Sequence, residues 1–214
     1  GQRTMTVPPE AGSVKMRNVI NKGITEQHVL NAVELAAAAG MKNIKLYYML
    51  GLPGEADSDI EEMIAMILRV REKMDAALNR GELIISVNGF IPKPFTPFQW
   101  SPLCDVKTLK RRFKMLESAF KKAKHIQVQT ESLKETVLQA VLSRGDRRIG
   151  KALLEAFQRE LPLKQVLKEQ GLDLEKLATT AYEIGGPLPW RHLDMGFSEA
   201  YLISEWQKAQ REEF

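Results

Sequence analysis

The chain has 214 residues, of which 44% are hydrophobic and 27% charged, as is ordinary for a globular protein. No apolar run reaches the ~18 residues that a membrane-spanning helix needs, and the net charge of +4 permits an anionic partner without requiring one. The single cysteine, Cys104, can form neither an internal disulfide nor a metal cluster alone, so we expect a reducing, cytoplasmic setting.

The first residues, Gly1-Gln2-Arg3, include neither an initiator Met nor a leader sequence, and we expect the chain to be a piece of a longer protein. Up to about residue 131, short apolar strands alternate with amphipathic helices. We predict strands at 4–8, 44–50, 83–91 and 126–129, and helices at 13–21, 25–40, 58–80 and 106–124.

Local signals support these helices. Thr25 is a good N-cap, Ser58 and Glu61 match a capping box, and Gly23 is expected to end the first helix in the left-handed conformation. The strand at 44–50 is almost continuously apolar, which predicts a strand covered on both faces.

Alternating strands and helices of these lengths predict an α/β fold with parallel strands and right-handed crossovers. Four strands are too few to close an eight-stranded barrel, so they suit an open half of a barrel or a small doubly wound sheet. Residues 4–8 would form an edge strand, through which we expect dimerisation or aggregation unless the helical region covers it.

A second region begins near residue 132, and we place a domain boundary there, giving domains at 1–131 and 132–214. Gly145, Pro162 and Gly171 punctuate this region, and Asp146 is expected to cap a helix. The predicted helices are 132–143, 147–160, 163–170, 173–183 and 198–212.

Ligands of open parallel sheets bind at the carboxyl ends of the strands. Three segments that follow predicted strands, 8–13, 51–55 and 91–100, combine Gly or Pro with a few polar side chains. The sequence therefore predicts a site at this edge of the sheet.

The order of Glu-Ala-Gly-Ser at 10–13, Asn-Lys-Gly at 21–23 and Gly-Leu-Pro-Gly-Glu at 51–55 resembles the second half of the radical S-adenosylmethionine (SAM) core. Similar spacing occurs in methylthiotransferases and oxygen-independent coproporphyrinogen oxidase. Segments 92–100 and 143–148, with the Leu-Pro-Trp motif at 188–194, are similar to an uncharacterised branch of that superfamily, which often carries an N-terminal cobalamin-binding-like domain.

This resemblance implies the C-terminal half of a partial (β/α)6 TIM-like barrel, followed by an α-helical region. It also implies SAM and a [4Fe–4S] cluster as cofactors of the full-length enzyme, with cobalamin as a further expectation. Radical SAM clusters are held by three cysteines, usually in a Cys-x3-Cys-x2-Cys motif, whereas this sequence has one. We therefore expect the missing N-terminal half of the same chain to hold the cluster, and this piece alone to be inactive. The substrate is unknown, and RNA and protein are both considered.

The resemblance also implies roles for particular residues. Glu10 would face the ribose or methionine part of SAM, Lys22 would pair with its carboxylate, and Tyr47 would contact its ribose. The remaining expected cofactor-binding residues are Ser13, Met49, Gly51, Phe90 and Ile91, and the expected substrate contacts are Lys93 and Gln99.

Simpler interpretations stay open for these residues. Glu10 could cap a helix, Lys22 could sit at a helix C-terminus, and Tyr47 and Met49 could belong to the core. Residues 51–54 could form only a strand-to-helix turn. An ordinary half-barrel enzyme that uses Glu10 and Lys22 as acid and base lacks an evident third catalytic group.

The helix at 106–124 offers a different function. It is strongly basic, which is typical of a solvated outer face or of a module that binds nucleic acid or an acidic protein. The basic residues are Lys107, Lys110, Arg111, Arg112, Lys114, Lys121, Lys122 and Lys124.

Overall fold

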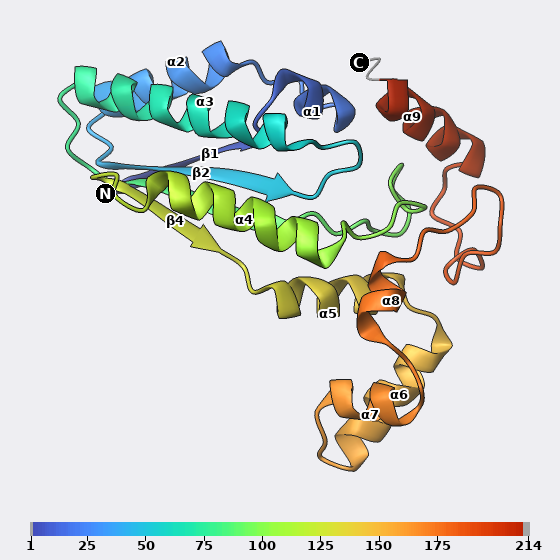
Figure 1. Ribbon diagram of the computed structural model, residues 1–214. Helices are drawn as coiled ribbons and strands as arrows, with labels where there is room; N and C mark the ends of the chain where they lie inside the picture. The colour runs from blue at the N-terminus through green and yellow to red at the C-terminus, as the bar shows by residue number, and fades with distance from the viewer. Residues whose placement is uncertain (1, 212–214) are drawn as a thin grey trace. The chain divides into compact units, whose positions relative to one another are not determined.

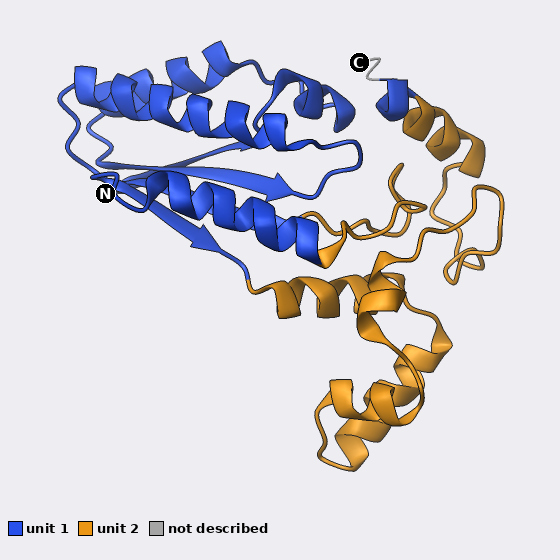
Figure 2. Cartoon of the chain, in the orientation of Figure 1, with its two compact units in different colours: residues 1–89, 107–131, 208–214 blue, residues 90–106, 132–207 orange. Residues whose placement is uncertain are grey.

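The computed structural model of the chain describes residues 2–211. Contacts divide it into two compact units (Figure 2). The first comprises the described parts of segments 1–89, 107–131 and 208–214, and the second comprises 90–106 and 132–207. The division into domains at residue 131 stays a prediction.

The first unit is built on a parallel sheet whose strand order is β1-β2-β3-β4 (Figure 1). The strands are β1 (Thr4–Glu10), β2 (Asn43–Leu50), β3 (Leu83–Gly89) and β4 (Ile126–Thr130). All neighbouring pairs are parallel, as the sequence predicts. Among the described residues, β1 and β4 are the edge strands.

Helices connect these strands. They are α1 (Val14–Val19) and α2 (Glu26–Ala38) between β1 and β2, α3 (Asp57–Ala76) before β3, and α4 (Val106–Phe120) before β4. In Figure 1, α2 and α3 lie over the same side of β1 and β2. Four parallel strands alternating with helices, followed by a helical region, confirm the predicted fold class and fit part of a TIM-like barrel.

The two faces of the sheet differ in burial. On β2, Leu46, Tyr48 and Leu50 are fully buried, whereas Tyr47 and Met49 on the opposite face are only half-buried. The expectation that both faces are covered is therefore wrong for the described residues. A period of two in burial leaves the alternate residues of β2 and β3 accessible on one face.

The helix signals had mixed outcomes. Thr25 is the N-cap of α2 and accepts a hydrogen bond from the His28 N–H at 3.2 Å, as predicted. The capping box at residues 58–61 is wrong, because α3 begins at Asp57 and its N-cap is Ala56. The left-handed residue after α1 is Asn21, with φ 50°, rather than Gly23, because Asn tolerates this conformation through its short polar side chain.

Helices dominate the second unit. They are α5 (Leu133–Arg144), α6 (Arg147–Gln158), α7 (Leu163–Glu169) and α8 (Leu174–Thr179), and α9 (Glu199–Arg211) begins in this unit. Asp146 caps α6 by accepting a hydrogen bond from the Arg148 N–H at 2.9 Å, which confirms that prediction. The core consists of Leu103, Ala140, Val141, Ile149, Ala152, Ala156, Val166, Leu167 and Ala178.

From residue 2 to residue 211, no helix combines the length and the apolar character that crossing a membrane requires.

Candidate functional site

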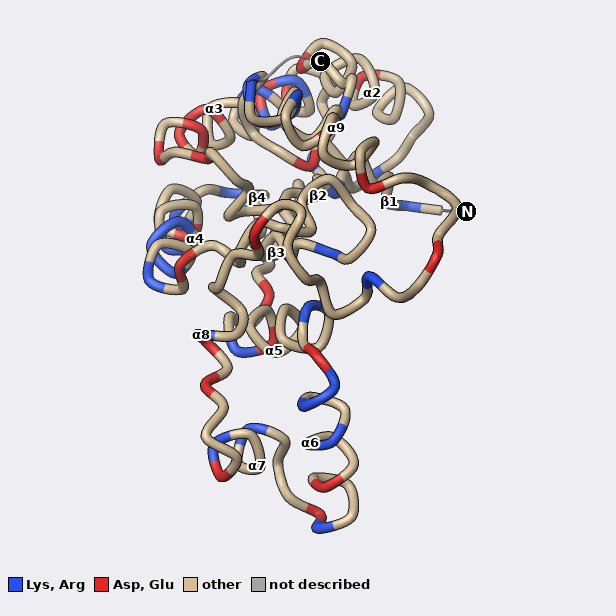
Figure 3. The backbone as a smooth tube through the Cα atoms, turned by 90° about the vertical axis from the view of Figure 1, so that its right-hand side faces the viewer, with Lys and Arg blue, Asp and Glu red and all other residues tan. Residues whose placement is uncertain are grey.

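The carboxyl ends of β1, β2 and β3 lie at one edge of the sheet, because the strands are parallel. Figure 3 views the first unit from this end. The chain leaves β1 at Glu10 and β2 at Leu50, and each strand is followed by a turn that contains glycine. Among the predicted site residues, Glu10 ends β1, and Ser13 and Gly51 lie in these two turns.

Glu10 and Lys22 form an ion pair at this edge. The Lys22 Nζ atom lies 3.4 Å from Glu10 Oε1, and the two side chains are 28% and 21% exposed. Glu10 has φ 68°, a left-handed conformation that costs a residue with a Cβ about 1–2 kcal/mol. The structure therefore brings together two predicted site residues and leaves their charges accessible to a ligand.

Ser13 is placed differently. The residue is only 1% exposed. Its hydroxyl donates a hydrogen bond to Asp59 Oδ1 at 2.6 Å and accepts one from the Met16 N–H at 3.0 Å. Ser13 thus caps α1 and ties it to α3. Its predicted contact with a cofactor gains no support from this geometry.

The tight turn before Ser13 explains Gly12. A Cβ atom at this position would lie 2.2 Å from the Cβ of Met63 and 2.6 Å from its Cα. Only glycine allows the turn after β1 to approach α3 so closely.

The turn after β2 is organised by Glu55. Gly51 and Gly54 have φ values of 89° and 80°, and the Gly51 N–H donates to Glu55 Oε2 at 2.6 Å. Arg112 on α4 donates to the same oxygen at 2.9 Å. Residues 51–54 thus form a turn between β2 and α3, and contact of Gly51 with a cofactor remains a prediction.

Burial raises the pKa of Glu55 to about 7, although the Gly51 N–H and the Arg112 guanidinium act in the opposite direction. Neither Glu55 nor Arg112 was predicted from the sequence to act at this turn. The sequence feature that could have predicted this bond is the position of Glu55 directly after Gly54. From this position, the Glu55 carboxylate can reach back to the N–H of Gly51.

Tyr47 and Met49 lie on the half-buried face of β2. Tyr47 Oη accepts a hydrogen bond from Asn88 Nδ2 at 3.1 Å, and Met49 is the β2 residue paired with Asn88 on β3. The phenolic O–H of Tyr47 can still donate. The alternative that both residues belong to the core does not fit their partial exposure.

Phe90 and Ile91, which follow β3, belong to the second unit. Phe90 packs edge-to-face against Phe98, with ring centroids 5.4 Å apart, and Ile91 packs against the core of that unit. The structure gives both residues packing partners there, and their contact with a cofactor remains a prediction.

The two predicted substrate contacts make hydrogen bonds inside the second unit. Lys93 Nζ donates to Ser143 Oγ at 2.8 Å. Gln99 is 3% exposed, and its Oε1 accepts from Trp190 Nε1 at 2.8 Å and from the Phe95 N–H at 3.2 Å. Gln99 therefore holds the loop in place, and its geometry does not favour contact with a substrate.

The motifs that resemble one branch of radical SAM proteins meet in this unit. Arg144 is 1% exposed and donates to the carbonyl oxygens of Ala178 and Thr180 at 2.7 and 2.9 Å. The Tyr182 hydroxyl donates to the Arg144 carbonyl, and the Tyr182 ring packs edge-to-face on Trp190. These motif residues therefore stabilise the second unit.

A [4Fe–4S] cluster needs three thiolate ligands, and the sequence contains only Cys104. Within residues 2–211, no three or more His, Cys, Asp and Glu side chains are placed so that they could hold a metal ion. The described residues therefore do not fit the cluster that the resemblance implies.

Comparison with known proteins supports the resemblance. Residues 1–67 match the Radical SAM superfamily. The chain is also 38% identical over 151 residues to the uncharacterized protein MJ0966 of Methanocaldococcus jannaschii, an alignment that covers 71% of this chain and 32% of that protein. The chain thus spans about a third of the length of this relative, and no solved structure matches. The match over residues 1–67, which carry β1, β2 and the turns after them, confirms the predicted resemblance to the radical SAM superfamily.

Proposed function

We propose that the chain is part of a radical SAM enzyme and that the carboxyl ends of β1 and β2 hold SAM. The observation that carries the proposal is the Glu10–Lys22 ion pair, which is partly exposed and lies within the segment that matches the superfamily. An ammonium and a carboxylate side by side complement the carboxylate and ammonium of an amino acid, such as the methionine part of SAM.

Individual roles follow from where the residues lie. Lys22 donates to the carboxylate of SAM, and Glu10 accepts from its ammonium or ribose. Tyr47 can donate from the half-buried face of β2, and Met49 adds an apolar surface there. Gly51 has no side chain to block the end of β2. A [4Fe–4S] cluster held elsewhere in the full-length protein would supply the electron that cleaves SAM and starts radical chemistry on the substrate.

We also propose that cysteines outside this chain hold the cluster. Roughly two thirds of the length of the archaeal relative lies outside the aligned segment, which leaves ample room for a cluster-binding region there. The single thiol of the chain suits a reducing, cytoplasmic compartment. Cobalamin is not part of the proposal, because no described feature argues for it.

SAM binding to the 214-residue chain tests the proposal. Amide shifts in NMR spectra are followed during titration with SAM and with S-adenosylhomocysteine. We expect weak, saturable binding that shifts Ala11 and Gly51, at the carboxyl ends of the strands. Lys22→Met and Glu10→Gln should each weaken SAM binding about tenfold or more, because each substitution removes one charge-assisted hydrogen bond.

Lys42→Met is the matched control, because Lys42 is an exposed lysine directly before β2, at the opposite end of the strand. Equal binding by Lys22→Met and Lys42→Met, or shifts that cluster around Lys42, would refute the proposed site. Anaerobic reconstitution with iron and sulfide should leave the chain without a stoichiometric [4Fe–4S] cluster.

A second candidate function rests on α4. Arg111 pairs with Asp57, and Arg112 pairs with Glu55, so these two cations hold the first unit together. The other cations of the helix and of the loop after it are exposed and make no ion pair within the described part of the chain. They are Lys107, Lys110, Lys114, Lys121, Lys122 and Lys124. In Figure 3, the positions of Lys and Arg along α4 are coloured blue.

Of these lysines, Lys107, Lys110, Lys114 and Lys121 are spaced along one face of α4 and its extension. Such a stripe fits the phosphates of nucleic acid. Binding of single-stranded RNA should weaken steeply as the salt concentration rises. The double variant Lys110→Glu/Lys114→Glu should weaken RNA binding and reduce the slope of log affinity against log salt concentration by about two. RNA binding that does not change with salt or with this substitution would refute this function.

A further inference from the structure

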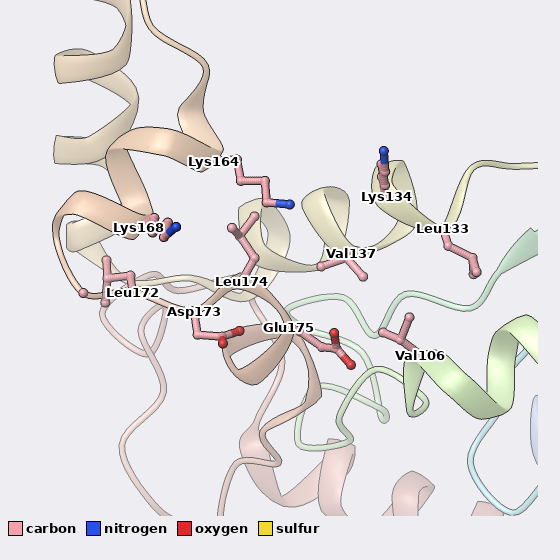
Figure 4. Close-up of a pocket in the computed structure, with 11 residues that line it drawn as sticks. Val106, Leu133, Lys134, Val137, Lys164, Lys168, Leu172, Asp173, Leu174 and Glu175 are labelled. Atoms are coloured by element: carbon pink, nitrogen blue, oxygen red, sulfur yellow. The ribbon is translucent and has the colours of Figure 1, made fainter.

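The second unit contains a cavity of about 620 Å³ (Figure 4). Its walls come from α5, α7, the turn after α7 and α8. This volume lies within the range of sites for small molecules, about 300–1,000 Å³. The cavity is separate from the proposed SAM site in its residues, and nothing in the radical SAM resemblance assigns it a role.

Apolar side chains line the middle of this cavity. Val137, Leu172 and Leu174 pack against the core of the second unit, and each of them remains half-buried. Leu133, one turn before Val137 on α5, adds to the same surface. The core therefore continues into a hollow whose apolar surface is not covered by the described residues, and which favours an apolar ligand group.

Three lysines surround this apolar surface. Lys164 and Lys168 lie one turn apart on α7, and Lys134 lies on α5. All three are exposed, and none forms an ion pair with another residue between positions 2 and 211. In Figure 4, Lys164 and Lys134 lie along one margin of the cavity, with Leu174 and Val137 next to them.

Two carboxylates lie at the opposite margin, and they do not cancel this charge. Asp173 is the N-cap of α8, and its Oδ1 accepts a hydrogen bond from the Lys176 N–H at 3.0 Å. Glu175 is the second carboxylate. Three ammonium groups against two carboxylates, one of them used as a cap, leave the cavity with an excess of positive charge.

We propose that this cavity binds a small amphiphilic anion, in which an apolar chain or ring ends in a carboxylate or a phosphate. The apolar part lies on Val137, Leu172 and Leu174, and the anionic group pairs with Lys164 and Lys168. Neither part suffices alone, because exposed ion pairs are weak and an apolar group gains no selectivity from the lysines.

Calorimetric titration of the 214-residue chain with matched probes tests this. Octanoate and octyl phosphate represent the two anionic groups, 1-octanol has the same chain without charge, and acetate and inorganic phosphate have charge without the chain. We expect saturable binding of at least one anionic amphiphile and at least about tenfold weaker binding of the other three probes. The preferred anion then distinguishes a carboxylate ligand from a phosphate ligand.

The matched variants are Lys164→Glu/Lys168→Glu, in the cavity, and Arg147→Glu/Lys151→Glu, two exposed cations one turn apart on α6 that do not line it. The cavity variant should lose binding at least about tenfold, and the control should keep it. If charge reversal unfolds α7, as circular dichroism would show, Lys164→Gln/Lys168→Gln replaces it. Octanol binding as tightly as octanoate and octyl phosphate, equal effects of the two variants, or no saturable binding would overturn the proposal.

Discussion

Arg112 on α4 donates a hydrogen bond to the carboxylate of Glu55, which lies 57 residues earlier in the chain. The two side chains are only 8% and 1% exposed. The same carboxylate oxygen accepts the N–H of Gly51, and a second nitrogen of Arg112 donates to the Glu55 carbonyl. One buried ion pair therefore fixes the turn after β2 to α4. This turn belongs to the segment that carries the proposed SAM site.

Arg112→Met should destabilise the chain by about 3–5 kcal/mol, because it leaves a buried carboxylate without its cation. Burial already raises the pKa of Glu55 to about 7. Below about pH 7 the buried carboxyl is protonated and needs no cation, so the loss should be smallest there and should grow as the pH rises above this value. Urea unfolding at several pH values measures it.

Arg111→Met is the control for this substitution. Arg111 is the neighbouring residue and pairs with Asp57 through side chains that are 51% and 41% exposed. Its removal should cost less than about 1 kcal/mol. Similar losses for the two arginine variants would contradict the importance of the buried pair.

Gly12→Ala should destabilise the chain by about 1–3 kcal/mol or more, because the new Cβ would overlap Met63 and its backbone. The matched control is Gly23→Ala, eleven residues later. A Cβ at Gly23 meets nothing within 4 Å, so we expect a change within about 0.5 kcal/mol or a small gain from the stiffer unfolded chain. Equal unfolding midpoints in urea for the two variants would contradict the close approach of this turn to α3.

Sequence periodicity predicted the strands and helices well, because each depends on local alternation of apolar and polar residues. The caps Thr25 and Asp146 were also predictable, since their partners lie within three residues. The start of α3 was not. Asp59 accepts the N–H of Ala56 and also the hydroxyl of Ser13, 46 residues away, and this partner favours an earlier start of the helix than Ser58 implied.

The candidate site shows the same division. Glu10 and Lys22 were expected together from the resemblance, and the structure places them in an ion pair. Ser13 and Gln99 were expected to face ligands, but they bond to Asp59 and Trp190. A polar side chain near the end of a strand looks the same in the sequence whether it faces a ligand or bonds to another part of the fold. The residues that the fold brings next to it decide which group it contacts.

Ser13→Ala should reduce stability in a manner that depends on pH. Burial tends to raise the pKa of Asp59, but hydrogen bonds from the Ser13 hydroxyl and the Ala56 N–H, together with Lys15, lower it below its usual value. A lowered folded-state pKa gives stability that is present above the unfolded value, about 3.9, and is lost as the pH falls through the folded pKa.

The substitution removes both the cap of α1 and one of these donors, so we expect a loss of about 1–2 kcal/mol at pH 7 and a smaller loss at pH values where Asp59 is protonated. Urea unfolding between neutral and acid pH measures this. Ser58→Ala, next to Asp59 in an exposed position, should change stability by less than about 0.5 kcal/mol. A pH-independent loss in Ser13→Ala would separate Ser13 from the titration of Asp59.

Gln99→Leu distinguishes the two interpretations of Gln99. If this side chain only contacts a substrate, its replacement leaves stability unchanged. The structure predicts a loss of about 1–3 kcal/mol, because the N–H groups of Trp190 and Phe95 lose their buried acceptor. Trp190→Phe and the double variant complete a cycle, in which we expect a coupling of about 0.5–3 kcal/mol between directly bonded residues. Additive losses would show that the Trp190–Gln99 hydrogen bond does not hold the second unit together and would restore Gln99 as a candidate substrate contact.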